Sequence, residues 1–196
     1  MKRGDKTERG EATRAALVAA ARELFSERGY AAVGTEEVVA RAGVTRGALY
    51  HHFADKKELF RAVYDQAEAE VVESILAATA AIEDPIEQVV AGVRSFLDAC
   101  MDPALTRIGV LDAPVVLGWA EWREIGARHA LGLVAAGLQN AMDAGALRAA
   151  DVEPLAHLML GAAGEAAMLV ANAKDPRAAR KQVEPALLDL LEGLRA

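Results

Sequence analysis

The segment TEEVVARAGVTRGALYHHFADKKEL, from Thr35 to Leu59, holds the side chains best suited to binding a nucleic acid. A short helix beginning at Arg46 would place Arg46, Gly47, Tyr50 and His51 on its outer side, so that this side carries hydrogen-bond donors and a flat ring. An arginine can donate two parallel hydrogen bonds to guanine, a contact worth about 1–3 kcal/mol in discrimination between bases. The residue types therefore predict a surface for DNA.

Three short helical signals position these side chains. Thr35 is predicted to cap a first helix whose apolar side is formed by Val38, Val39 and Ala42 and which ends at Gly43. Thr45 is predicted to cap a second helix, with Ala48, Leu49 and Phe53 facing inward. Asp55 and Glu58 resemble a capping box at the start of a third helix, where Lys56 lies beside free backbone N–H groups that favour a phosphate. Two helices joined by a tight turn and followed by a third are typical of DNA-binding domains.

The region from about residue 14 to residue 64 resembles the tetracycline-repressor (TetR) family of bacterial transcriptional regulators. The segment LVAAARELFSERGY, from Leu17 to Tyr30, resembles the first helix of that family, and the segment AGVTRGALYHHFADKKEL is nearly the family signature. Val39 departs from the usual small alanine, and Gly34 is a second departure. Neither lies on the expected DNA-binding face.

The resemblance implies roles for individual residues. Arg46, Gly47, Tyr50 and His51 would enter the major groove. Four others would hold phosphates, namely Thr35, Thr45, His52 and Lys56. Tyr50 and the two histidines have a second interpretation as partly buried supports of the recognition helix. Glu36 and Glu37, in the first turn of the preceding helix, are interpreted as partners of the helix dipole rather than as contacts to cytosine.

The charge of −7 is unevenly distributed along the 196 residues. Residues 1–64 hold 12 Lys and Arg against 9 Asp and Glu, whereas residues 65–196 hold 10 against 20. A basic part can approach phosphates while an acidic part stays away from them, which favours one orientation on DNA. The composition, 53% hydrophobic, supports one or two domains with a sizeable core.

The pattern along the chain predicts an all-α fold without strands. We expect a helix-turn-helix DNA-binding head, residues 1–55, and a helical ligand-binding and dimerisation body, residues 56–196. A long helix from Lys56 to about Ile82 would join them. The other helices are expected over residues 13–28, 35–42, 46–53, 119–144 (loosened at Gly126), 152–173 and 176–194, with further helices starting near Pro85, Pro103 and Pro114.

The segment LAHLMLGAAGEAAMLVANA, from Leu155 to Ala173, is as long as a membrane span. Glu165 would lie near the bilayer centre at a cost of roughly 3 kcal/mol, and aromatic belts are absent, so burial in protein is the preferred interpretation. The small residues of this segment and the apolar stripe of the last helix predict a dimer surface, as the resemblance also implies. The stripe consists of Val183, Leu187, Leu190, Leu191 and Leu194. A purely intrachain core is the alternative.

The resemblance implies a small-molecule pocket in the body and release of DNA when the pocket is filled. The candidate lining residues are the bulky or polar ones in an alanine-rich background: Phe96, Cys100, Met101, Trp119, Trp122, His129, Met168 and Asn172. Ordinary helix packing is the competing interpretation for each. The effector is expected to be small and largely apolar.

Other classes of protein fit the sequence less well. Glu124 and His129 are five residues apart and Glu153 and His157 four apart, which is not the Glu-x-x-His spacing of di-metal helical bundles. No phosphate loop, zinc cluster or nucleophile elbow is evident, so neither an enzyme nor a metal or cofactor is expected. A helical adaptor that binds protein instead of DNA is the alternative function. Arg46 and Lys56 at the DNA-facing positions argue against it.

The compartment is predicted from the termini and the cysteine content. Cys100 is the single cysteine, which excludes an intrachain disulfide and fits a reducing compartment. The N-terminus shows no apolar core typical of a secretory signal. We expect a cytoplasmic, homodimeric, ligand-responsive repressor that binds an inverted-repeat operator, and repression rests on the resemblance alone.

Overall fold

The computed structural model describes residues 3–196, and these are organised as a chain of helices joined by short loops. In chain order the elements are α1 Arg3–Arg28, α2 Thr35–Ala42, α3 Arg46–His52, α4 Lys56–Thr79, α5 Pro85–Ala99, α6 Pro103–Leu105, the π-helix η1 Thr106–Asp112, α7 Ala113–Leu117, α8 Trp119–Asp143, α9 Val152–Ala171 and α10 Pro176–Glu192. No strand occurs within this range, apart from one isolated β-bridge between Leu147 and Arg195. The predicted all-α fold is confirmed.

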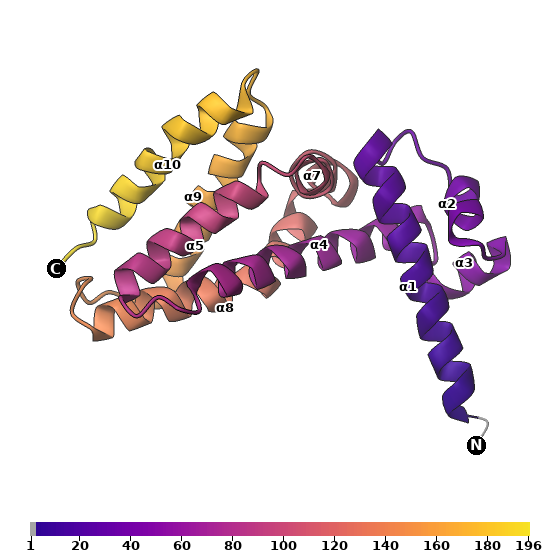
Figure 1. Ribbon diagram of the computed structural model, residues 1–196, viewed down its shortest axis with the longest axis horizontal. Helices are drawn as coiled ribbons and strands as arrows, with labels where there is room; N and C mark the ends of the chain where they lie inside the picture. Colours follow the sequence, from indigo (N-terminus) through magenta and orange to yellow (C-terminus); the bar gives the residue numbers. More distant parts are fainter. Residues whose placement is uncertain (1–2) are drawn as a thin grey trace.

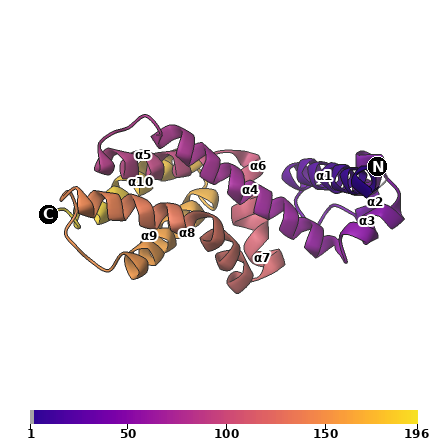
Figure 2. The same ribbon diagram turned by 90° about the horizontal axis from the view of Figure 1, so that it is seen from below.

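Helices α1, α2 and α3 lie together at one end of an elongated molecule, and α4 leads from them into the rest of the chain (Figures 1 and 2). Gly43 ends α2 in the left-handed conformation, with φ of 66°, which a glycine adopts without steric cost. The Thr45 hydroxyl accepts a hydrogen bond from the Ala48 N–H at 3.2 Å and caps α3, as predicted. The sharp turn between α2 and α3 follows from these two residues.

The predicted cap at Thr35 is wrong. Thr35 is already the first helical residue of α2, and Gly34 occupies the capping position without a side chain to contribute. The Glu37 carboxylate compensates by accepting a hydrogen bond from the Gly34 N–H at 3.1 Å. Helix α2 therefore begins with one of the two hydrogen bonds of a capping box, the one that the Glu37 side chain accepts from the backbone of the capping residue.

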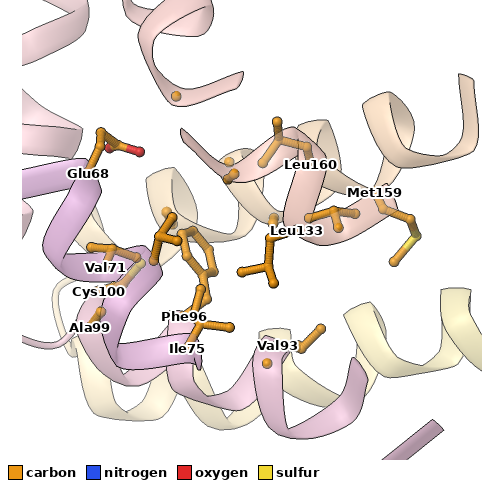
Figure 3. Close-up of a pocket in the computed structure, with 18 of the residues that line it drawn as sticks. Glu68, Val71, Ile75, Val93, Phe96, Ala99, Cys100, Leu133, Met159 and Leu160 are labelled. Atoms are coloured by element: carbon orange, nitrogen blue, oxygen red, sulfur yellow. The ribbon is translucent and has the colours of Figure 1, made fainter. Parts of the chain in front are cut away.

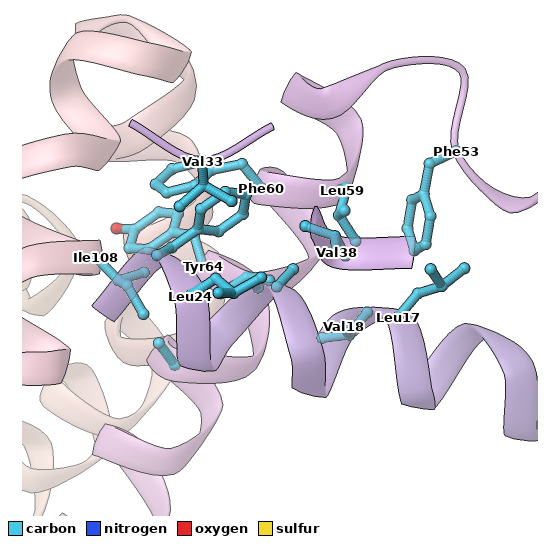
Figure 4. Close-up of a cluster of buried hydrophobic side chains, with 14 of the residues drawn as sticks. Leu17, Val18, Leu24, Val33, Val38, Phe53, Leu59, Phe60, Tyr64 and Ile108 are labelled. Carbon is cyan, nitrogen blue, oxygen red and sulfur yellow. The ribbon is translucent and has the colours of Figure 1, made fainter. Parts of the chain in front are cut away.

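Helix α4 is capped as predicted, because the Asp55 carboxylate accepts a hydrogen bond from the Glu58 N–H at 2.7 Å. Its first turns contribute Leu59, Phe60, Val63 and Tyr64 to a buried cluster shared with α1, α2 and α3 (Figure 4). The predicted division of the chain at residue 56 remains a prediction, and this cluster contains side chains from both sides of it.

The second half of the molecule is built from α5, α8, α9 and α10 (Figures 1 and 2). Helices α5 and α8 pack against α4, α9 packs against α8, and α10 packs against α9 and α5. Aspartates cap three of these helices: Asp84 caps α5, Asp151 caps α9 and Asp175 caps α10. Leu138, Ala141, Leu147, Ala156 and Leu191 form the centre of a separate buried cluster there. Helix α8 joins the two clusters, because its first turns belong to the cluster of Figure 4 while Leu138 and Ala141 belong to the second.

The segment from α6 through η1 to α7 connects the two halves. Between Thr106 and Asp112 the chain forms a π-helix, whose backbone hydrogen bonds join residues five apart and make its turns wider than those of an α-helix. Ile108 and Ala113 are fully buried in the same cluster as Phe25 of α1 and Phe60 of α4. The connecting segment therefore packs against the end of the molecule that holds α1 and the start of α4.

Several boundaries differ from the expected ones. Helix α1 starts at Arg3 instead of residue 13, α4 stops at Thr79 instead of near Ile82, and α8 passes through Gly126 without interruption. The apolar stripe of the last helix is partly used inside the chain, because Leu187 and Leu191 are buried. The small residues of α9 also serve intrachain packing, since a Cβ on Gly164 would lie 4.0 Å from the Trp122 ring.

Helix α9 is long and apolar enough to cross a membrane by length and composition, and only 22% of its most apolar window is buried within the chain. Leu158 and Leu169 are 71% and 54% exposed, and Glu165 between them is exposed too. The helical spacing of these three residues places them on one face of α9. This face is left uncovered by the single chain.

Candidate DNA-binding surface and internal cavity

The outer face of α3 carries the side chains that the sequence predicted for DNA. Arg46, Gly47, Tyr50 and His51 are all exposed, while Leu49 and Phe53 are buried beneath them. The alternation follows directly from the helical period, because Leu49 and Phe53 lie on one side four residues apart. The structure thus brings these four predicted residues together on one surface.

Arg46 has two partners in the DNA-free protein. Its Nη1 lies 2.8 Å from Oε1 of Glu36 on α2, and its guanidinium lies 5.6 Å from the centre of the Tyr50 ring. Both charged side chains are about two-thirds exposed, so the ion pair is weak and water competes with it. The guanidinium is held near the recognition face and is available for exchange with a base.

The two histidines of α3 differ in their surroundings. Their rings are 5.2 Å apart in an edge-to-face arrangement. His51 is exposed, whereas His52 is half-buried, and a Cβ on Gly10 of α1 would lie 3.9 Å from the His52 ring. His52 therefore combines a supporting position against α1 with a place at the edge of the surface.

Lys56 lies at the start of α4 with its Nζ 4.0 Å from the centre of the Tyr30 ring. Burial lowers the pKa of its ammonium group, although the carboxylates of Asp112 and Glu37 oppose this change. The Tyr30 ring in turn packs on Phe25 and Phe60. Lys56 is thus fixed by the aromatic core of the head, beside the capped N-terminus of α4.

A cavity of about 590 Å³ lies in the body between α4, α5, η1, α8 and α9. Its walls are mainly aliphatic and aromatic, with Ile75, Phe96, Leu133 and Met159 among the side chains around it (Figure 3). A concave, mostly apolar space with few polar groups is typical of a small-molecule site.

Three of the eight candidate pocket residues line this cavity, namely Phe96, Cys100 and Trp122. The other five do not: Met101, Trp119, His129, Met168 and Asn172. Trp119 is 61% exposed beside Trp122, and His129 pairs with Asp65 at 3.0 Å. The Asn172 amide donates a hydrogen bond to the Met168 carbonyl at the end of α9. Bulk and polarity alone did not distinguish cavity residues from these surface and capping positions.

Glu68 and Tyr64 of α4 are cavity residues that sequence reasoning missed. The Glu68 carboxylate lies between two glycines, because a Cβ on Gly109 would lie 3.9 Å from its Oε1 and a Cβ on Gly126 3.7 Å from its Oε2. Tyr64 is fully buried, and its hydroxyl lies 3.5 Å from the Trp122 carbonyl oxygen. A signal was present, since Tyr64, Glu68, Val71 and Ile75 follow one helical stripe, which makes a carboxylate at the second position conspicuous.

Cys100 shares the polar end of the cavity. Burial raises the pKa of its thiol to about 12, with the nearby Glu68 carboxylate contributing in the same direction. A thiol with such a pKa carries almost no thiolate at neutral pH and is a poor nucleophile. Cys100 is therefore a packing residue of the cavity wall rather than a redox centre.

The π-helix η1 connects the cavity with the head. Thr106 and Gly109 line the cavity. At its far end the Asp112 carboxylate accepts a hydrogen bond from the Tyr30 backbone N–H at 2.7 Å. One short segment therefore contacts both the internal space and the helix-turn-helix.

A second connection runs between α4 and α8. The Glu121 carboxylate pairs with Arg61, and it also lies 3.3 Å from the Lys57 ammonium nitrogen. These cations lower the pKa of the Glu121 carboxyl, with the Arg61 hydrogen bond as the largest cause. The start of α8, next to the cavity residue Trp122, is thereby attached to the helix that carries the head.

Comparison with protein-family models agrees with this geometry. The model for bacterial regulatory proteins of the tetR family matches residues 17–63, which run from the middle of α1 to the first turns of α4. The model for the tetracyclin repressor-like C-terminal domain matches residues 86–194. Together the two matches cover both halves of the molecule.

Individual relatives lead to the same family. The TetC protein of transposon Tn10 from Escherichia coli is 30% identical over 151 residues, which are 77% of this chain and 76% of the relative. The crystal structure of a TetR-family transcriptional regulator from Pectobacterium atrosepticum is 37% identical, covers 100% of this chain and 98% of its own, and has a TM-score of 0.87.

A more distant structure shares the fold. RolR, solved in complex with resorcinol, is 22% identical, with a TM-score of 0.75 over 94% of this chain and 89% of its own.

Among residues 3–196 no group of three or more His, Cys, Asp or Glu side chains is placed to hold a metal ion. The chain belongs to the TetR family of bacterial transcriptional regulators and has its DNA-binding helix-turn-helix domain at the N-terminus.

Proposed function

We propose that this regulator is a homodimeric, ligand-responsive repressor that binds an inverted-repeat operator and leaves it when a small, largely apolar effector fills the cavity. The observation that carries the proposal is the arrangement of η1, which lines the cavity at Gly109 and accepts a hydrogen bond from the head at Asp112. Occupancy of the cavity would displace this segment and so change the position of the head. Repression and cytoplasmic location follow from the family habit.

DNA binding is assigned to the face of α3 and the neighbouring helix starts. Arg46, Gly47, Tyr50 and His51 would contact base edges in the major groove. Phosphates would be held by Thr35, Thr45, His52 and Lys56. Thr35, although not a cap, is half-exposed at the start of α2, where free N–H groups favour an anion. The exposure of the first four and the location of the others around them support this assignment.

Dimerisation is assigned to α9 and α10. Leu190 of α10 is 55% exposed, and Leu158 and Leu169 of α9 are exposed as well. Pairing of two chains about a twofold axis through these helices would cover the face of α9 with Leu158 and Leu169 that the single chain leaves exposed. It would also place two α3 helices in one complex, which a palindrome requires.

Ligand response is supported by the cavity and by one structural relative. RolR was solved with resorcinol, a small aromatic molecule, and it shares this fold. In this chain the cavity is lined by Phe96, Cys100 and Trp122 among many aliphatic residues. The adaptor alternative explains the fold but gives no role to the exposed Arg46 and Tyr50 on α3.

Selection from a random pool of DNA duplexes by the purified full-length protein, at near-physiological salt, tests the proposal. Any molecule that copurifies is removed first, because it would hold the protein off DNA. We expect enrichment of an inverted repeat. Absence of any enriched sequence with ligand-free protein would contradict DNA recognition and favour the adaptor.

A further inference from the structure

Glu68 is an acidic side chain in a mostly apolar wall. It projects from α4 toward the cavity, near Val71 and Cys100 (Figure 3). The carboxylate is half-buried between α4, η1 and α8, where it lines the cavity. Its position therefore places a hydrogen-bond acceptor at one end of an apolar space.

Among the described side chains, no cation forms an ion pair with this carboxylate, since no Lys, Arg or His nitrogen lies within ion-pair distance of Glu68. His129, whose charge acts on Glu68, is paired with Asp65. Arg123, the other charged residue of the lining, has its guanidinium 5.9 Å from the centre of the exposed Trp119 ring.

A buried carboxylate without a counter-charge is energetically unfavourable. Burial accordingly raises the pKa of Glu68, and Asp65 acts in the same direction, while a hydrogen bond from Tyr64 and the His129 charge oppose the rise. The Cys100 thiol, which also faces this end, is neutral and supplies no charge. The protein would lower its free energy by binding a cation at this point.

We propose that the effector is an organic cation whose apolar body fills the cavity and whose protonated amine donates a hydrogen bond to the Glu68 carboxylate. The inference rests on the proposed function, since it names the chemical class of ligand for the same cavity. The apolar part would lie along the side chains of Ile75, Phe96 and Leu133. An anionic effector would be repelled by the Glu68 carboxylate. A neutral effector would leave the charge of this carboxylate unpaired.

Three probes with the same apolar chain and different head groups separate these classes: decylamine, decanol and decanoate. Their binding to the wild-type protein, to Glu68→Gln and to Glu124→Gln would be measured by isothermal titration calorimetry. Glu124 is the matched control, because it lies on α8 with a side chain that is 77% exposed. Gln keeps the size of the side chain and removes only its charge.

For the wild-type protein we expect decylamine to bind roughly tenfold more tightly than decanol, since a hydrogen bond between two charged groups is stronger than one from a neutral hydroxyl. Glu68→Gln should lose this preference, and Glu124→Gln should keep it. Equal binding of the amine and the alcohol, tighter binding of decanoate, or no binding of the amine would overturn the inference.

The same probes distinguish failure of this inference from failure of the proposed function. If decanol or decanoate binds more tightly and releases the selected DNA, the cavity still regulates and only the cationic class is wrong. If decylamine binds through Glu68 but the protein selects no DNA sequence, the ligand class stands and the repressor proposal falls.

Discussion

Arg46 lies between the Glu36 carboxylate and the Tyr50 ring in the DNA-free protein. Both contacts are exposed to solvent, so they orient the guanidinium without holding it strongly. On DNA the same guanidinium would exchange Glu36 for a guanine edge. Glu36 would then discourage contact with phosphates and bases that offer Arg46 no better partner, which would favour specific over non-specific binding.

Replacement of Arg46 tests its role in base recognition. Arg46→Ala should relax base preference at one position in each half-site, with a loss of about 1–3 kcal/mol in discrimination per contact. The measurement is repeated selection from a random duplex pool with the variant. Lys56→Ala is the comparison variant. Loss of a phosphate contact should weaken binding to all DNA sequences by a similar factor and make the affinity less dependent on salt concentration. Unchanged preference in Arg46→Ala would show that α3 is not oriented as we propose.

Glu68 gives the protein a pH-dependent stability. Its pKa is raised in the folded state, chiefly by burial, so the carboxyl group ionises more readily in the unfolded chain. The free energy of unfolding should therefore fall as the pH rises from the ordinary carboxyl range through the raised pKa of Glu68. Glu68→Gln cannot ionise and should lose less stability over this range.

Urea unfolding at a series of pH values, at one protein concentration, measures this effect. The stability difference between Glu68→Gln and the wild type should grow in favour of the variant as the pH rises, and then stay constant. Glu124→Gln should follow the wild-type profile, since its carboxylate is exposed in both states. Parallel profiles for Glu68→Gln and the wild type would contradict the burial of an unpaired carboxylate.

At the scale of elements, η1 is the segment through which the cavity and the head are in contact. Asp112 accepts the Tyr30 N–H, while Ile108 is buried against head residues. A packed segment of this kind has discrete arrangements rather than a continuous range. A ligand beside Gly109 would therefore shift η1 between positions instead of deforming it gradually.

Asp112→Ala tests this connection. Removing the acceptor leaves the Tyr30 N–H without its partner, at a cost of about 1–3 kcal/mol. Hydrogen exchange of the peptide segment that contains Tyr30 should become faster by roughly tenfold or more in Asp112→Ala. Asp112→Asn retains an oxygen acceptor and should stay close to the wild type. Equal exchange in all three proteins would exclude the proposed role of Asp112.

The elements differ in how well the sequence predicts them. Local chemistry determines the caps at Thr45 and Asp55 and the turn at Gly43, and these were predicted correctly. The cap at Thr35 was wrong, because Gly34 and the Glu37 carboxylate start α2 without a capping hydroxyl. A one-residue shift at a helix start is a choice between nearly equal local arrangements.

The cavity was harder to predict, because it depends on contacts between helices far apart in sequence. Trp119 and Trp122 are similar residues three positions apart, yet Trp122 lines the cavity and donates to the Gly109 carbonyl at 2.9 Å, while Trp119 faces solvent. The orientation of α8 against α4 and η1 decides between them. Periodicity within one helix identifies the side that is buried. It does not show whether that side packs against another helix or lines a cavity.

At the scale of the whole molecule, the head and the acidic body occupy opposite ends of an elongated chain (Figure 1). The uncovered apolar face lies on α9, in the body, away from α3. A dimer formed there would leave both recognition helices free. Two heads related by a twofold axis then approach DNA with the acidic bodies behind them.

Leu169→Asp tests the dimer surface. A charge on the exposed face of α9 would be buried at the proposed interface and should shift the protein toward monomers. The measurement is molar mass by light scattering after size-exclusion chromatography. Val115→Asp is the control, since Val115 is 83% exposed and lies outside α9 and α10. If Leu169→Asp keeps the mass of a dimer, the interface lies elsewhere.

The most direct measurement of the whole account is the affinity for the selected repeat before and after about five base pairs, half a helical turn, are inserted between its halves. A dimer with two fixed heads should lose specific binding, a decrease of about a thousandfold or more toward the non-specific level. Equal affinity for both duplexes would mean that each head binds independently, and it would contradict recognition of an inverted repeat by a rigid dimer.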